Sequence, residues 1–248
     1  MSQDFDLIFG LHAVRSALQH PNRLAEVLMD GGRRDQRMRE LVDLAEQAGV
    51  RLRQVSPNEL DTLADGGRHQ GVVARLRQQQ IQDEPYLKAL LKRLDEAPFL
   101  LILDEVQDPH NLGACLRTAE GAGVHAVITP RDRSASLNPT VRKVASGAAE
   151  TVPFIQVTNL ARTLKWLKQE GVWLIGTAGE AEQLVYDCDL KGPLAIVMGG
   201  EGKGMRRLTR EQCDLLIKLP MAGTVESLNV SVATGVTLYE AVRQRLAS

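Results

Sequence analysis

Residues 99–130 read FLLILDEVQDPHNLGACLRTAEGAGVHAVITP, an apolar run, a helical pattern and a second apolar run. The runs Phe99–Leu103 and Val124–Thr129 are almost wholly apolar, which is typical of parallel strands that are covered on both faces. The pattern near residues 112–122 predicts a helix that crosses from one strand to the next. This stretch therefore predicts a β-α-β unit within a parallel α/β sheet.

The same alternation continues to the end of the chain. Further strands are expected at Val172–Gly176, Leu194–Met198 and Leu215–Leu219, and further helices near residues 139–147, 159–169 and 229–245. Residues 98–248 are thus expected to form one α/β unit, in which helices cover both sides of a parallel sheet.

Residues 1–76 show a shorter pattern of their own. Apolar runs at Leu7–Phe9, Val27–Met29, Val50–Val55 and Gly71–Leu76 alternate with helical patterns near residues 11–19, 36–48 and 57–63. This alternation predicts a small α/β unit of about four strands. Residues 77–97 are expected to be a glutamine-rich linker followed by a short lead-in helix at Pro85–Leu94.

Composition restricts the class of protein. Of 248 residues, 44% are hydrophobic and 25% are charged, which is ordinary for a globular chain and excludes disorder and coiled coil. No apolar stretch approaches the ~20 residues of a membrane span, and the polar start MSQDFD is not a signal peptide. Three scattered cysteines do not form a disulfide framework, so we expect a cytoplasmic protein. The five histidines lack metal-ligand spacing, so no metal site is expected.

The charge balance points away from nucleic acid when it is taken alone. Lys and Arg number 30 and Asp and Glu number 31, for a formal charge of −1. A generally basic nucleic-acid binder is therefore not indicated, and the total favours an enzyme for a small molecule.

Three loops that follow predicted strands carry the candidate chemistry, because open α/β sheets bind ligands at the carboxyl ends of their strands. In the first loop, Asn111 is expected to cap a helix, and Arg117 lies about a turn and a half into it. The second loop holds four glycines in six residues around Glu201, which implies positive φ angles or a backbone that a ligand touches. Its spacing matches neither a dinucleotide-binding motif nor a P-loop.

The third loop runs from Leu219 into the last predicted helix. Ser227, Asn229 and Ser231 supply hydrogen-bonding groups at the helix start, where Asn229 or Ser227 can act as the N-cap. The apolar side chains of this loop could line a ligand pocket, although core packing is the more frequent use of such residues.

Taken in order, these loops resemble the three motifs of the SpoU/TrmH family of RNA ribose 2′-O-methyltransferases, within the SPOUT superfamily. The motifs are Asn111-x5-Arg117, Gly199-x-Glu201-x2-Gly204, and Pro220-Met221 with Ser227 to Ala233. The first unit, with His69-Gln70-Gly71, resembles the family's L30e-like substrate-binding domain. The resemblance implies a SPOUT α/β-knot catalytic domain with a deep C-terminal trefoil knot. It also implies S-adenosylmethionine (SAM) as the cofactor, and a homodimer whose active site takes residues from both chains.

The resemblance also assigns residues to roles. The catalytic set is Arg117, Asn111, Glu201, Asn229 and Ser231, and the SAM-binding set is Thr177, Ala178, Gly199, Leu219, Met221 and Leu228. Arginine stays protonated in proteins, so we prefer that Arg117 binds a phosphate and stabilises the developing negative charge on the 2′-oxygen.

Two basic clusters could contact RNA. We prefer the one in the catalytic unit, Arg131, Arg133, Arg142 and Lys143, over the run Arg33, Arg34, Arg37 and Arg39. With these local clusters, the near-neutral total no longer argues against RNA. Binding should then depend on recognised RNA structure more than on bulk attraction.

The branch of the family that fits best implies methylation of a guanosine in 23S rRNA, in the peptidyl-transferase P loop. Three alternatives stay open: a tRNA enzyme of the same family, a non-catalytic RNA-binding module, and an α/β enzyme with a nucleotide cofactor. The motifs themselves do not name the modified nucleotide.

Overall fold

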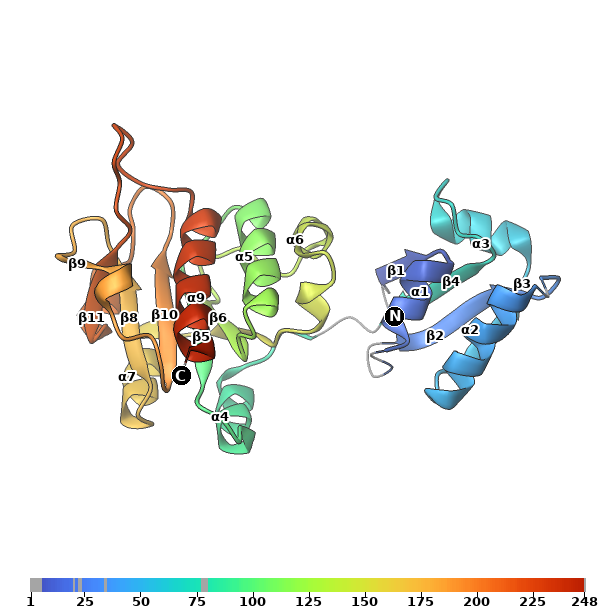
Figure 1. Ribbon diagram of the computed structural model, residues 1–248, viewed down its shortest axis with the longest axis horizontal. Coiled ribbons are helices and arrows are strands. Elements are labelled where there is room, and N and C mark those ends of the chain that lie inside the picture. Colours follow the sequence, from blue (N-terminus) through green and yellow to red (C-terminus); the bar gives the residue numbers. More distant parts are fainter. Residues whose placement is uncertain (1–5, 20, 22–23, 34, 77–79, 248) are drawn as a thin grey trace. The chain divides into compact units, whose positions relative to one another are not determined.

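The computed structural model describes residues 6–19, 21, 24–33, 35–76 and 80–247 (Figure 1). The chain divides into two compact units between Gln79 and Gln80. Each unit has a β-sheet of its own. Arg34, and residues 77–79 of the predicted linker, lie outside the described residues.

The first unit is a four-stranded mixed sheet with three helices, as its sequence pattern predicts. Its elements are β1 (Asp6–Phe9), α1 (Leu11–Ala17), β2 (Leu24–Asp30), α2 (Gln36–Gln47), β3 (Leu52–Val55), α3 (Pro57–Ala64) and β4 (Val72–Leu76). The strand order is β1-β4-β2-β3, and β2 pairs in parallel with β3. Val14 of α1 and Leu41 of α2 pack in the larger core of this unit, and Leu60 of α3 packs in a smaller one.

The second unit contains a seven-stranded sheet whose recorded pairings are all parallel. Its strands are β5 (Phe99–Asp104), β6 (Ala126–Pro130), β7 (Phe154–Val157), β8 (Trp173–Thr177), β9 (Gln183–Leu184), β10 (Leu194–Gly199) and β11 (Leu215–Lys218). Its helices are α4 (Glu84–Arg93), α5 (Pro109–Gly121), α6 (Pro139–Ala145), α7 (Leu160–Gln169), α8 (Arg207–Gln212) and α9 (Val230–Leu246), with short 3-10 turns at Ala148–Glu150 and Val185–Asp187. The predicted parallel α/β sheet is confirmed.

Helices cover both faces of this sheet because successive strand residues point to opposite sides. On one face Leu101 and Leu103 of β5 join a core with α5, α6 and α9. On the other face Leu100 and Ile102 join a core with α4 and α7. Figure 1 shows α5 and α9 side by side, and the two helices contact each other directly.

The structure also departs from the sequence pattern in several places. The sequence pattern does not predict strands β7 and β9 or helix α8: β9 has only two residues, α8 has only six and lacks a clear apolar stripe, and β7 is a four-residue strand interrupted by Gln156. Helix α5 begins two residues before Asn111, and the N-cap is Asp108, whose carboxylate accepts from the backbone N–H of His110. The cap predicted for Asn111 is therefore wrong. Gln82, in the predicted linker, forms a bridge with Ile155 at the sheet edge.

Strand order decides what meets at the carboxyl edge of the sheet. The order is β7-β6-β5-β10-β8-β11-β9, so β10 lies between β5 and β8 although it follows both in the chain. The loops after β5, β8, β10 and β11 therefore leave the sheet next to one another. The predicted trefoil knot stays a prediction. Of the helices that the structure describes, none combines the length and apolarity needed to cross a bilayer.

The last helix is fixed near its end by a buried carboxylate. Glu240 accepts hydrogen bonds from Nε and a terminal nitrogen of Arg243 at 2.9 and 2.7 Å, and from Gln244 at 2.8 Å. Gln244 in turn binds the backbone at Cys188 and Leu190. The hydrogen bonds from Arg243 and then Gln244 lower the pKa of Glu240 to about 2.

We expect this carboxylate to make stability depend on acid pH. A lowered folded-state pKa stabilises the fold above the ordinary value near 4.5, and that contribution disappears as the pH falls toward 2. Glu240→Gln should therefore unfold at lower urea concentration than the wild type at pH 7, and the difference should shrink between pH 4.5 and pH 2.5. Glu211→Gln, at an exposed ion pair with Arg207, serves as the control. A deficit for Glu240→Gln that is the same at every pH would contradict this interpretation.

Candidate functional site

The carboxyl edge of the sheet includes Thr177, Gly199 and Leu219, three of the six predicted SAM-binding residues. Thr177 ends β8 and is in register with Ile217 of the neighbouring β11, and Leu219 follows directly. Gly199 ends β10 and is in register with Asp104 at the end of β5. Four segments that are distant in sequence thus end side by side, which is the arrangement that open parallel sheets use for ligands.

A chain of side-chain hydrogen bonds joins the three motif loops across this edge. The amide nitrogen of Asn111 donates to the Glu201 carboxylate, and its amide oxygen accepts from Asn229 at 3.0 Å. These partners lie 90 and 118 residues from Asn111 in the sequence. Asn111 is buried, so both ends of its amide are satisfied by protein groups. Asn111 therefore holds the second and third loops against helix α5.

Asn229 extends the chain into helix α9. Its side-chain oxygen accepts from the backbone N–H of Ser231 at 2.9 Å and from the Ser231 hydroxyl at 2.7 Å. This is the N-cap geometry that the sequence predicts for Asn229. The cap and the link to Asn111 use opposite ends of one amide, so the start of α9 is positioned by the same residue that reaches the first loop.

The glycines of the second loop are explained by backbone geometry. A Cβ on Gly199 would lie 2.3 Å from the backbone at Gly204, and one on Gly200 would lie 2.4 Å from the carbonyl oxygen of Glu105. Gly202 and Gly204 have φ angles of 76° and 67°, which favour glycine. The loop turns back on itself through a bridge between Gly200 and Gly204, and this turn presents Glu201 to Asn111.

Sequence reasoning missed a charged cluster at the end of β5. Asp104 is fully buried and accepts from the backbone N–H and the guanidinium of Arg206, at 2.7 to 2.9 Å. The next residue, Glu105, has φ 64° and lies between Arg133 and Arg206 at 3.5 and 3.6 Å. An acidic pair that ends an apolar strand is the signal that could have indicated this cluster. It ties the segment after the glycine loop to β5.

The structure does not join Arg117 to the other predicted catalytic residues. Its side chain is exposed, and among the described residues it has no hydrogen bond or ion pair. It lies six residues after Asn111, about 9 Å further along α5 at 1.5 Å per residue. Asn111, Glu201, Asn229 and Ser231 thus form one network, and Arg117 stands apart from it on the surface.

The third loop supplies exposed apolar side chains beside the network. Residues 220–229 have no regular structure and are exposed throughout. Met221 and Leu228 are 37% and 40% exposed, although both are large apolar residues. Met221 and Leu228 therefore do not pack in the core, and their exposure fits a wall for an apolar ligand, whereas Leu219 is partly buried against the core.

Cys115 lies beneath the site but is no nucleophile. It is buried on α5, where its thiol faces Thr234 at 3.6 Å. Burial raises the pKa of the Cys115 thiol to about 11, so the thiol stays protonated at neutral pH. The part of the chain that the structure describes also holds no group of three metal-binding side chains.

Only part of the predicted RNA-binding cluster is exposed and able to contact RNA. Arg131, Arg133 and Lys143 are exposed. Arg142 is 12% exposed and donates to Glu150, which is 4% exposed. A guanidinium committed to a buried carboxylate is a structural group, so we leave Arg142 out of the proposed RNA surface.

Comparison with known proteins gives two family matches. Residues 98–239 match the SpoU rRNA Methylase family, and residues 7–82 match the family described as RNA 2′-O ribose methyltransferase substrate binding. The two matches fall mainly on the second and first units, respectively.

Similar proteins extend over nearly the whole chain. The 23S rRNA (guanosine-2′-O-)-methyltransferase RlmB of Pseudomonas putida is 57% identical over 246 residues, which cover 99% of this chain and 98% of that protein. The protein of the same name from Escherichia coli K12 is 56% identical over 97% of this chain and 99% of that protein. The structure of the SpoU methyltransferase AviRb from Streptomyces viridochromogenes with AdoMet aligns with a TM-score of 0.72 at 24% identity. The alignment covers 98% of this chain and 91% of AviRb. This likeness shows the fold.

The hydrogen-bond chain predicts a specific local response to substitution. Asn229→Ala should lower the free energy of unfolding by about 1 kcal/mol, because it removes a helix cap. It should also speed amide exchange at residues 230–233 and in the glycine loop, since the link to Asn111 is lost. Asn159→Ala removes an equivalent cap from α7 and serves as the control. Unchanged exchange in the glycine loop of Asn229→Ala would show that the network does not hold it.

Proposed function

Because the chain belongs to the SpoU rRNA methylase family, we propose that it methylates the ribose 2′-hydroxyl of a guanosine in 23S rRNA, with SAM as the methyl donor. The observation that carries this function is similarity to 23S rRNA guanosine 2′-O-methyltransferases over 97–99% of the chain. We assign residues 1–76 to RNA docking and 98–248 to methyl transfer. Of the predicted connection 77–97, helix α4 packs in the core of the second unit through Leu87 and is therefore counted with that unit. We place the target in the peptidyl-transferase P loop and the enzyme in the bacterial cytoplasm, where ribosomal RNA is assembled.

The carboxyl edge of the sheet fits SAM. Three neighbouring strands end at or just before Thr177, Gly199 and Leu219, which is the edge at which open parallel sheets bind ligands. Met221 and Leu228 offer apolar contacts for an adenosine. Ala178 lies at the same edge, where its N–H is bound to Ile217. When bound, SAM supplies an electrophilic methyl group on a sulfonium.

The residues of the chain then align the ribose with the methyl group and stabilise the charge that develops on the 2′-oxygen. The ribose 2′-oxygen forms its bond to the methyl carbon as the carbon–sulfur bond breaks, and the hydroxyl proton passes to solvent water. This displacement needs no protein nucleophile, so alignment of the ribose oxygen supplies much of the acceleration. The network of Asn111, Glu201 and Asn229 holds the loops around the cofactor site in one arrangement. Arg117 binds the phosphate beside the target ribose and stabilises the negative charge that develops on the 2′-oxygen.

A second copy of the chain completes this site in our proposal. Val232, Tyr239 and Leu246 are 52%, 52% and 84% exposed and recur every seven residues along α9, so they lie on one face. A continuous apolar face of this kind is typical of protein interfaces. Helices α5 and α9 contact each other, and a Cβ on Gly235 of α9 would lie 3.7 Å from the methyl group of Thr118, the residue next to Arg117. A partner seated on α9 would thus lie beside Arg117, which has no partner among the described residues of its own chain.

Cells that lack the protein provide the test of function. Mapping of 2′-O-methyl groups should show one guanosine of 23S rRNA without its methyl group, restored by the wild-type chain. A missing methyl group in tRNA would favour the tRNA enzyme instead. No change in either RNA, together with no SAM binding, would favour a non-catalytic RNA-binding module. Binding of NAD or ATP in place of SAM would favour a nucleotide-cofactor enzyme.

Arg117→Ala should lower methyl transfer about 100-fold or more while SAM binding, measured by calorimetry, is retained. Arg117→Lys should fail as well, because a lysine cannot make the bidentate contact to phosphate. Arg162→Ala, at an exposed arginine of α7, is the control and should keep full activity. Near-normal turnover of Arg117→Ala would remove the role that we assign to it.

The proposed dimer leads to a separate prediction. Val232→Glu should give a monomer in sedimentation equilibrium and should also reduce methyl transfer, because a charge would be buried in the interface. Trp173→Glu changes a similarly exposed apolar residue, at the opposite end of the sheet, and should stay dimeric. A dimeric Val232→Glu protein would place the interface elsewhere.

A further inference from the structure

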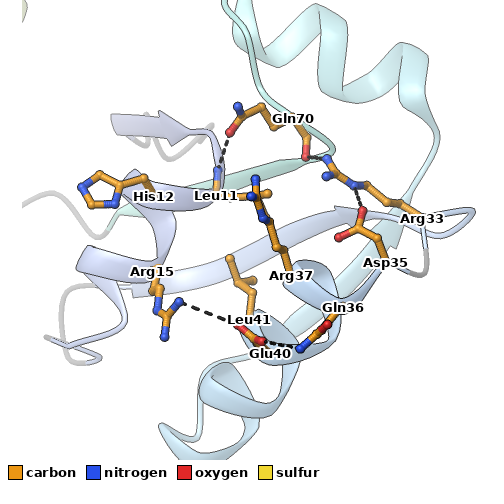
Figure 2. A pocket seen from close by; sticks show the side chains of 10 residues that line it. All are labelled: Leu11, His12, Arg15, Arg33, Asp35, Gln36, Arg37, Glu40, Leu41 and Gln70. Atoms are coloured by element: carbon orange, nitrogen blue, oxygen red, sulfur yellow. Dashed lines mark hydrogen bonds and ion pairs between the residues drawn. The ribbon is translucent and has the colours of Figure 1, made fainter.

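The first unit contains a pocket of about 840 Å³ (Figure 2). Helices α1 and α2 supply most of its lining, and Gln70 lies at its rim. The pocket belongs to this unit alone, so it is separate from the network of the second unit. Its volume is in the range of about 300–1,000 Å³ typical of pockets for small ligands, which is enough for one nucleotide.

Four of the lining side chains are basic: His12, Arg15, Arg33 and Arg37. Arg33 donates to Asp35 and to the backbone oxygen of Gln70. Arg15 lies 3.8 Å from Glu40, and both side chains are largely exposed. The side chains of Arg37 and His12 have no hydrogen bond or ion pair with any residue that the structure describes. Arg37, which Figure 2 shows in the middle of the pocket, is therefore a positive charge without a protein partner.

The rim of the pocket is a strained turn. Gln70 has φ 52° although it is not glycine, and Gly71 follows with φ 76°. The Gln70 side chain accepts from the backbone N–H of Leu11 at 3.1 Å, and its carbonyl binds Arg33. His69 accepts from the Gly71 N–H at 3.1 Å and contacts Asp61 at 3.0 Å through its other nitrogen. Strained conformations of this kind persist where the surroundings hold them and concentrate at binding sites.

The turn is made of the His69-Gln70-Gly71 sequence that the methyltransfer site does not use. A Cβ on Gly71 would lie 3.0 Å from the Arg33 side chain, so glycine leaves room for that arginine to reach Gln70. Gln70 connects the start of α1 to Arg33, just before α2. The turn thus holds both walls of the pocket and keeps Arg33 engaged, while Arg37 stays free.

We propose that this pocket binds one unstacked nucleotide of the RNA substrate. Leu11, which is partly exposed, offers an apolar contact to a base, and Arg15 and Arg37 offer charges to its phosphates. RNA loops present splayed bases, which proteins hold by stacking on planar groups such as guanidinium and by contacts to the backbone. The inference rests on the proposed function for its ligand, and it places sequence-dependent docking in the first unit.

Charge reversal of Arg37 tests the pocket in the full chain. Arg37→Glu should bind a 23S rRNA stem-loop that contains the target guanosine about 10-fold or more weakly, and the slope of log Kd against log salt should fall by about 1. Arg39→Glu makes the same change two residues along α2, outside the pocket lining, and should stay within about threefold of the wild type. SAM binding should be equal in all three proteins. Equal loss of RNA affinity in the two variants would overturn the proposal.

Two further measurements identify the ligand. Ultraviolet crosslinking of the RNA, mapped by mass spectrometry, should place a nucleotide on peptides that contain His12 or Arg37. Crosslinks confined to the second unit, or binding of free guanosine monophosphate as tightly as the stem-loop, would overturn it. A wild-type chain that binds this RNA through Arg37 but does not methylate it would refute the proposed function and leave the pocket intact.

Discussion

The amide of Asn111 is the contact on which the functional part of the structure depends. It donates to Glu201 and accepts from Asn229, so one side chain of α5 holds both the glycine loop and the start of α9. A side-chain amide can serve both partners only when an acceptor, here the Glu201 carboxylate, lies at its nitrogen and a donor lies at its oxygen. Because the amide is buried, loss of either partner would leave an unsatisfied polar group. The three loops are therefore held as a set.

The parallel sheet makes this contact possible. Strand β10 lies between β5 and β8, and its close packing against the neighbouring backbone requires glycine at positions 199 and 200. The ion pair between the buried Asp104 and the partly exposed Arg206 ties the segment after the glycine loop to β5. Backbone packing thus determines the conformation of the glycine loop, and that conformation places Glu201 beside Asn111. Arg117 is outside this arrangement, which is why we assign it to the RNA backbone and place a second chain beside it.

Local patterns predicted the elements of both units well. The apolar runs predicted most of the strands, and one of the two caps that the sequence offers for the last helix, Asn229, is present, because a cap depends on residues three or fewer positions apart. Prediction from the sequence failed where the role of a side chain depends on a partner from another element of the fold. The Asn111 side chain looks like a cap in sequence, but Asp108 takes that place and leaves the Asn111 amide free for Glu201 and Asn229. Arg142 looks like part of a basic patch, but Glu150 engages it.

The sequence by itself determined the two-unit α/β organisation and the motif residues, since alternation of apolar runs with helical patterns and the order of short motifs are both local properties. Tertiary structure alone decided which of these residues meet. Strand order, the chain of hydrogen bonds through Asn111, and the pocket around Arg37 depend on pairings between segments up to 118 residues apart. No local pattern specifies such pairings, because they arise from backbone pairing and side-chain packing across the whole sheet.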